Sequence, residues 1–175
     1  LTRARAIAGD AALADRAETT IADVLRRPRD RKLIARDVVD MRQRLVKKAG
    51  SGNDDLWDLK MVRGGLLDIE FIAQYLQLIH AAKAPEVLHP NTCKALSNLA
   101  RAKFLSRRDA DDLIAASGLY RDLMALFRVA VVGEFDPPAA PRGTVNAVLR
   151  IAEIADMAQL EQRLAETQAG VFAAF

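Results

Sequence analysis

The sequence contains one cysteine and two histidines in 175 residues. A single thiol, that of Cys93, cannot close a disulfide within the chain or supply a thiolate-rich metal site. His80 and His89 have no partner at the spacing of zinc ligands. We therefore predict that this chain holds no metal, and we interpret Cys93 as a structural residue on the inner face of a helix.

Long apolar runs are also missing. No stretch approaches the roughly 18 consecutive apolar residues that a membrane-spanning helix requires. The chain opens on Leu1 and carries no signal-peptide pattern. These features predict a cytoplasmic protein that does not contact a membrane, and they suggest a piece of a longer polypeptide.

Aromatic residues are few, at 5%, while apolar residues make up 51% of the chain. Alternating strand patterns are absent and helical periodicity runs nearly throughout. We predict an all-α fold, a bundle of about eight helices that forms a single helical domain over residues 1–175. The helices are expected at about 2–8, 11–26, 30–48, 66–82, 91–101, 106–132, 144–155 and 158–174, with connectors at 50–55 and 133–143.

The net charge of +3 is unevenly distributed. Residues 1–50 carry 13 Lys and Arg against 7 Asp and Glu, a balance of +6, and the remainder carries 13 against 16, a balance of −3. No aromatic residue occurs in the first fifty positions, so nucleic-acid bases have no stacking platform there. The densest group of positive residues, which we call the basic cluster, comprises Arg26, Arg27, Arg29, Arg31 and Lys32. We interpret it as a solvated loop between helices, and contact with a polyanion is the alternative.

Residues 58–75 combine cations, a glycine pair and an apolar helix. Lys60 and Arg63 lead into Gly64-Gly65, and a glycine pair can adopt positive φ and approach another group closely. The helix that follows presents unpaired N–H groups and the positive end of its dipole. The segment therefore predicts a site for an anion, such as a phosphate or a carboxylate of a neighbouring domain. A glycine-hinged helix start with solvated cations is the alternative.

The polar residues of this helix fall on different sides. At about 100° per residue, Asp68 and Glu70 lie roughly 200° apart and cannot hold one metal ion together. Asp68 shares an apolar face and lies in the first turn, where negative charge is favoured. We interpret it as the organiser of the glycine pair, or as a simple helix-start charge. Glu70, Gln74 and Gln77 form one narrow polar stripe.

Residues 60–77, together with Leu-Thr-Arg-Ala-Arg at 1–5, resemble the bacterial glutamine synthetase adenylyltransferase family. The matching pattern is Lys-x-x-x-Gly-Gly-Leu-x-Asp-Ile-Glu-Phe, followed by an apolar helix rich in Gln and Leu. Arg29-Asp30, the Asp-Val-Val-Asp-Met-Arg segment at 37–42 and the Gly-Glu-Phe-Asp loop at 133–136 also fit. The resemblance spans essentially the whole chain and favours the C-terminal, adenylylating half of such enzymes.

The resemblance implies a parent enzyme in which a nucleotidyltransferase domain precedes the helical bundle. Such enzymes transfer AMP from ATP, with Mg²⁺, to a tyrosine of glutamine synthetase. They also remove it by phosphorolysis, under the control of glutamine and a PII-type signal protein. The Asp-x-Asp pair on a strand that holds the metal is missing here, because Asp109 and Asp111 lie within an expected helix. We therefore expect the helical domain downstream of the catalytic domain, inactive on its own.

In that parent, Lys60, Arg63, Gly64 and Gly65 are expected beside the nucleotide phosphates. Glu70 and Gln74 are expected to contact the nucleotidyltransferase domain or the nucleotide. The rival interpretation is a docking module for glutamine synthetase or a PII-type protein, with the basic cluster and the proline loop at 133–143 as its surface. Neither nucleic acid nor membrane is expected as a partner. The related uridylyltransferases of nitrogen signalling share parts of this architecture.

Overall fold

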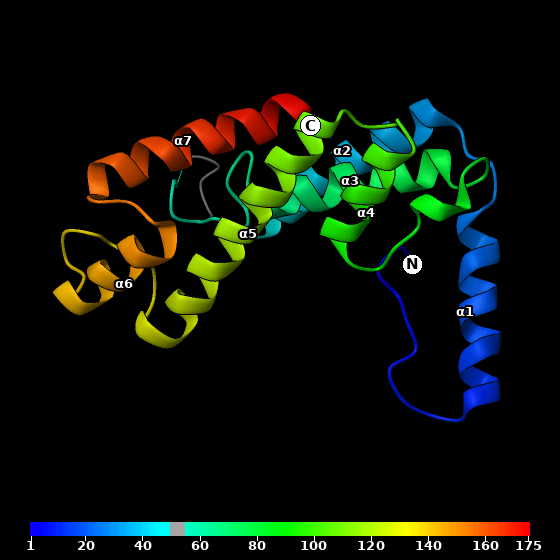
Figure 1. Cartoon of the computed structure of the whole chain (residues 1–175), viewed down its shortest axis with the longest axis horizontal. Coiled ribbons are helices and arrows are strands. Elements are labelled where there is room, and N and C mark those ends of the chain that lie inside the picture. Colours follow the sequence, from blue (N-terminus) through cyan, green and yellow to red (C-terminus); the bar gives the residue numbers. More distant parts are fainter. Residues whose placement is uncertain (50–54) are drawn as a thin grey trace. The chain divides into compact units, whose positions relative to one another are not determined.

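All regular secondary structure in the part described by the computed structural model, residues 1–49 and 55–175, is helical (Figure 1). No strand occurs in these two ranges, which confirms the predicted all-α fold of about eight helices. Residues 50–54, most of the expected connector at 50–55, lie outside the described ranges. The elements are α1 (Ala11–Leu25), α2 (Arg31–Ala49), α3 (Leu66–His80), the 3₁₀ helix η1 (Pro85–Val87), α4 (Thr92–Arg101), α5 (Arg107–Ala130), α6 (Arg142–Ala152) and α7 (Met157–Ala174).

Side-chain caps explain where several helices begin. Asp10, Asn91 and Asp156 precede α1, α4 and α7, and each side chain accepts the N–H group three residues later. The donor–acceptor distances are 2.9, 3.0 and 2.9 Å. Ser106 does the same before α5, at 3.0 Å. These contacts satisfy donors that the first turn of a helix leaves unpaired.

The expected helix at 2–8 is wrong, because no helix forms before α1. Thr2 is buried instead, and Arg3 Nη1 lies 2.7 Å from Glu70 Oε1 of α3. A helix of seven residues has little stability of its own. The tertiary contacts of Thr2 and Arg3 therefore determine the path of this segment.

The boundaries expected for α6 also require correction. The sequence predicts a start at about residue 144, but the helix begins at Arg142, directly after Pro141. Pro141 is the N-cap residue, with an extended ψ of 140°, and as a proline it has no N–H group that needs a partner there. The helix ends at Ala152 rather than near 155, since Glu153 adopts a left-handed conformation with φ of 55°.

The described structure contains two compact units, and the division falls within α2, α3 and α5. One unit comprises Leu1–Arg42 and Glu70–Leu113. A buried apolar cluster in this unit joins the end of α3 to η1 and α4. His80 stacks on Phe104 with ring centroids 3.8 Å apart. The members of the cluster are Ala81, Ala84, Val87 and Leu99, flanked by Leu76, Leu88, Ala102, Phe104 and Leu105.

The second unit comprises Gln43–Ile69 and Ile114–Phe175, and it contains the glycine pair. Its α6 and α7 are consecutive and pack together (Figure 1). An aromatic cluster holds two loops of this unit side by side. Phe135 stacks on Phe127 at 4.6 Å and meets the edge of Trp57 at 4.8 Å. The loop that leads to the glycine pair is therefore packed against the loop that follows α5.

Candidate functional site

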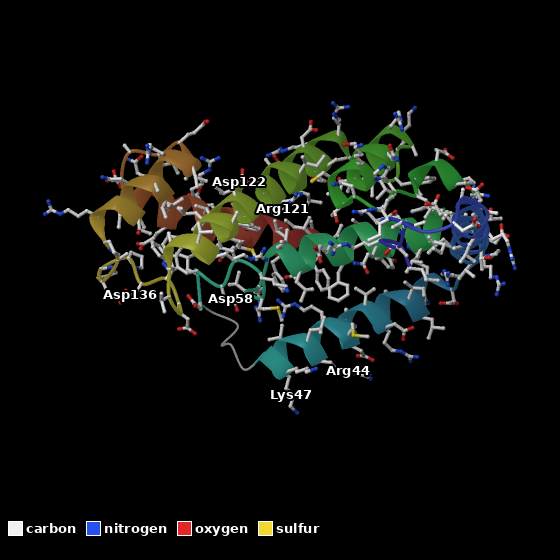
Figure 2. All side chains as sticks on the ribbon, turned by 90° about the horizontal axis from the view of Figure 1, so that it is seen from below. Arg44, Lys47, Asp58, Arg121, Asp122 and Asp136 are labelled. Carbon is white, nitrogen blue, oxygen red and sulfur yellow. The ribbon has the colours of Figure 1, made fainter. Side chains whose placement is uncertain are left out.

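Residues 58–65, which we call the glycine turn, form a closed structure before α3. Asp58, labelled in Figure 2, lies at its start, and its Oδ1 accepts the Met61 N–H at 3.1 Å. The first amides of α3 donate back into the turn. Leu66 donates to the Leu59 carbonyl at 2.8 Å, and Leu67 donates to the Lys60 carbonyl at 3.1 Å. The turn and the helix start therefore share one hydrogen-bond network.

Buried side chains bind both main-chain polar groups of Gly64. Its N–H donates to Asp68 Oδ2 at 2.7 Å, and its carbonyl accepts the Tyr120 hydroxyl at 3.2 Å. Asp68 and Tyr120 are both 0% exposed. Hydrogen bonds to buried groups matter because an unpaired buried polar atom has lost its water. Asp68 thus links the first turn of α3 to the glycine pair.

Helix α7 approaches Gly64 so closely that no side chain fits there. A Cβ at this position would lie 1.8 Å from the Gln168 carbonyl oxygen, and Gly64 has a φ of 78°. The Gln168 side chain also donates to the Leu56 carbonyl, at 2.9 Å. The glycine is therefore required for close packing of main chain on main chain, and for its left-handed conformation.

The amides of the glycine pair are not open to an anion. Besides the Gly64 contact with Asp68, the Gly65 N–H donates to the Val62 carbonyl at 2.8 Å. The main-chain donors that the sequence assigned to a phosphate are thus used inside the turn. The physical reason is that Asp68 supplies the negative charge for this helix start.

The two cations of the turn are placed differently from its amides. Lys60 and Arg63 are both exposed. The Arg63 guanidinium carbon lies 4.7 Å from the ring centroid of Phe172, which is 42% exposed. An arginine over an aromatic face is stabilised electrostatically and loses rotational freedom. The turn therefore presents two positive side chains on a rigid main chain.

Two residues of the stripe expected on α3, Glu70 and Gln77, make contacts within the chain. Glu70 pairs with Arg3, as described above. Gln77 is 2% exposed, and its side-chain oxygen accepts the His89 N–H at 2.9 Å. Gln74 is half-buried. Of the three residues, Gln77 is thus a buried structural residue rather than part of a solvated stripe.

The basic cluster lies around the connection of α1 to α2. Arg29 is half-buried, and its Nη2 donates to the Val24 carbonyl at 2.8 Å. Arg31 is exposed, and its Nε donates to the Tyr75 hydroxyl at 3.1 Å. These two arginines help to place the loop and the start of α2. The other members are exposed: Arg26, Arg27 and Lys32.

Carboxylates do not converge on a metal site within residues 1–49 and 55–175, where no group of three or more His, Cys, Asp or Glu comes together. The acidic residues of α5 instead pair along their own helix. Asp111 lies 3.2 Å from Arg107, and Asp112 lies 3.8 Å from Arg108. Over the same ranges, no helix is long and apolar enough to cross a membrane.

Three residues that hold the glycine turn were missed by sequence reasoning: Tyr120, Gln168 and Phe172. Tyr120 is 56 positions from its partner Gly64, and Gln168 is 112 positions from its partner Leu56. Helical periodicity identifies Tyr120 as an inward-facing residue, but it does not name the partner of the hydroxyl. No local pattern marks Gln168, a polar residue on the inner face of the last helix.

The buried Tyr120 hydroxyl predicts a loss of stability at alkaline pH. Burial raises the pKa of Tyr120 above its ordinary value, and the nearby Asp68 carboxylate raises it further. The folded state then keeps a proton that the unfolded state releases above about pH 10. The stabilisation by the protonated Tyr120 hydroxyl is therefore fully present below about pH 10, and the free energy of unfolding falls as the pH rises above that value. Urea denaturation of the wild type and Tyr120→Phe between pH 8 and 11 measures it. An equal alkaline decline in both proteins would contradict this assignment.

Comparison with known proteins identifies the family. A family model described as GlnD PII-uridylyltransferase matches residues 32–130. The chain is 43% identical over its full length to a bifunctional glutamine synthetase adenylyltransferase/adenylyl-removing enzyme of Rhodopseudomonas palustris strain TIE-1, of which it covers 18%. It is 44% identical over 98% of its length to the protein of that name in Bradyrhizobium sp. strain BTAi1, and 38% identical over 100% to that of Agrobacterium fabrum.

The chain spans less than a fifth of the length of these relatives, whose matches cover 98–100% of it. The family match covers more than half of the chain and includes the glycine turn, α3 and α5. The chain therefore belongs to the family described as GlnD PII-uridylyltransferase, and it corresponds to a segment of the bifunctional glutamine synthetase adenylyltransferases.

Proposed function

We propose that this chain is the helical domain of a bifunctional glutamine synthetase adenylyltransferase, downstream of a nucleotidyltransferase domain, and that its glycine turn lines the nucleotidyl-transfer cleft. In the parent enzyme, AMP passes from ATP to a tyrosine of glutamine synthetase and is removed again by phosphorolysis. Lys60 and Arg63 offset the negative charge of the phosphates there. The domain acts by positioning and electrostatics, and it forms no covalent bond to the substrate.

The proposal rests on one feature of the glycine turn. Its main chain is held by contacts within the chain, whereas the side chains of Lys60 and Arg63 are exposed. Asp68 and Tyr120 bind the polar groups of Gly64, so these groups do not depend on a ligand. Lys60 and Arg63 remain exposed. Charges that are already in place stabilise a transition state better than charges that must be rearranged. Phosphoryl and nucleotidyl transfers rely mainly on such groups.

The two cations differ in what they can contribute. Lysine offers a compact charge on a flexible stem, and arginine offers a planar fork that can hold two oxygens at once. Phe172 lies under the Arg63 guanidinium and limits its movement. Arg63 is therefore suited to orienting a phosphate, and Lys60 to neutralising one. Neither residue needs to transfer a proton for these roles.

Mg²⁺ belongs to another part of the proposed parent. No set of metal-ligating side chains comes together within the described residues, so the proposal places Mg²⁺ outside them. The carboxylates of the nucleotidyltransferase domain would hold it. The proposed partners are that domain, glutamine synthetase and a PII-type signal protein, and the proposed location is the cytoplasm.

A double substitution tests the role of the two cations. In the full-length enzyme, Lys60→Ala with Arg63→Ala is expected to lower kcat/KM for ATP by about tenfold or more, since each exposed phosphate contact contributes on the order of 1 kcal/mol. The measurement is the steady-state rate of glutamine synthetase adenylylation at varied ATP. The thermal midpoint should change little because both side chains are exposed.

The matched control removes two other exposed cations. Arg107→Ala with Arg108→Ala alters the start of α5, where these side chains are 84% and 91% exposed. This variant should keep the wild-type ATP KM and kcat. Unchanged kinetics in Lys60→Ala/Arg63→Ala would show that the two cations do not act on the phosphates. An equal loss of kcat/KM in both double variants would show that the effect comes from net charge and not from these two positions.

A further inference from the structure

Helix α7 makes three contacts with the glycine turn and the segment just before it, all within one compact unit. The Gln168 side-chain amide donates to the Leu56 carbonyl just before the turn. The Gln168 main-chain carbonyl lies against Gly64 at the end of the turn. Phe172, four residues later, lies under the Arg63 guanidinium. Residues four apart share one face of a helix, so a single face of α7 makes all three contacts.

We infer that α7 is the positioning element for the two cations of the turn, with Gln168 fixing the main chain and Phe172 orienting Arg63. The inference rests on the proposed function, because it concerns how the same two cations, Lys60 and Arg63, are held in position. Gln168 and Phe172 touch neither nucleotide nor protein substrate in this proposal. They act through the turn.

The burial of Gln168 supports this role over a simple surface contact. Gln168 is 7% exposed, and it is the one polar residue among the buried residues of α7, which are otherwise apolar. A buried amide is costly unless it is hydrogen-bonded, and the Leu56 carbonyl supplies the partner. An apolar side chain would fill the same space. The hydrogen bond to the Leu56 carbonyl therefore explains why this buried position of α7 carries an amide side chain.

The rigidity of a helix joins the two contacts. Gln168 and Phe172 lie one turn apart, so a displacement of α7 moves both together. The absence of a side chain at Gly64 leaves the carbonyl of Gln168 in direct contact with the turn. A shift of α7 would therefore be transmitted to the main chain of the turn and to Arg63 at the same time. This makes α7 the element through which the position of the cations can be set.

Replacing Gln168 by methionine tests the main-chain contact. Methionine has a similar length but no N–H donor. In the full-length enzyme, we expect amide hydrogen exchange of residues 56–65 to increase about tenfold, because loss of the hydrogen bond favours local opening of the turn. The expected kinetic effect is a severalfold rise in the KM for ATP. Gln162→Met is the matched control, since Gln162 is exposed on α7 and donates to Glu166 of its own helix.

Phe172→Leu tests the orientation of Arg63. The expected result is a shift of the Arg63 Nε–H resonance, because the ring no longer lies beside the guanidinium, together with a raised KM for ATP. In the Lys60→Ala/Arg63→Ala background, neither Gln168→Met nor Phe172→Leu should add to the kinetic loss, since residues that act through one group are not additive.

The outcomes separate this inference from the proposed function. Exchange of residues 56–65 that is equal in Gln168→Met and Gln162→Met would overturn the positioning role, whatever the kinetics of the cation variants. Full additivity with Lys60→Ala/Arg63→Ala would also overturn it. Increased exchange with unchanged kinetics in the cation variant would instead contradict the proposed function, while the contact between α7 and the turn would stand.

Discussion

Gly64→Ala is expected to destabilise the chain by about 3–5 kcal/mol, a large fraction of the stability of an ordinary domain. The new Cβ would be placed 1.8 Å from the Gln168 carbonyl oxygen, which belongs to helix main chain and cannot rotate away. The φ of 78° adds a further cost on the order of 1 kcal/mol for any residue with a Cβ. Relief would require α7 to move away from the turn, and the contacts of Gln168 would be lost with it.

Denaturant unfolding followed by circular dichroism measures this effect. Gly170→Ala is the control, because it lies in α7 two positions after Gln168 and a Cβ there meets nothing within 4 Å. That substitution should be neutral or stabilising by up to about 1 kcal/mol, since alanine is favoured over glycine within a helix. A Gly64→Ala protein as stable as Gly170→Ala would show that α7 does not approach the turn in solution.

Asp68→Ala is expected to cost about 3 kcal/mol. The substitution leaves the Gly64 N–H buried without its acceptor, and a lost charged hydrogen bond of this kind costs on the order of 1–3 kcal/mol. The space of a fully buried side chain would also be left empty, because Asp68 is 0% exposed. Asp68→Asn keeps an oxygen acceptor and should lose less.

Urea denaturation midpoints at neutral pH provide the measurement for the Asp68 variants. Asp122→Ala is the control, since Asp122 is an exposed residue of α5, labelled in Figure 2. Surface substitutions of this type usually change the free energy of unfolding by less than about 0.5 kcal/mol. If Asp68→Ala matched Asp122→Ala, the carboxylate would have no part in holding the turn.

The helical architecture could be predicted because its signals are local. Helical spacing of apolar residues placed α1, α2 and α7 within about one or two residues of their observed ends. The helix expected at about 91–101 is present as α4, and Asn91 caps it. The failures occurred where tertiary contacts override local signals, as in residues 2–8, which follow the burial of Thr2 and the ion pair of Arg3.

The glycine turn shows the same limit at the candidate site. A glycine pair before a helix indicates that the main chain approaches something closely, and this much could be predicted. The sequence does not say whether the neighbour is a ligand or another part of the protein. Here the neighbour of Gly64 is the main chain of α7 at Gln168, more than a hundred positions away. Long-range packing of this kind has no periodic or spacing signature.

Trp57 is the one tryptophan of the chain, and its place in the aromatic cluster makes it a built-in optical probe. Its indole lies beside the rings of Phe127 and Phe135. In sequence, Trp57 follows Leu56, whose carbonyl accepts the hydrogen bond from Gln168. Emission wavelength depends on how much water surrounds an indole. The fluorescence of the unlabelled chain therefore reports how much water reaches the residue just before the glycine turn. No dye is needed, and no second tryptophan of the chain contributes to the signal.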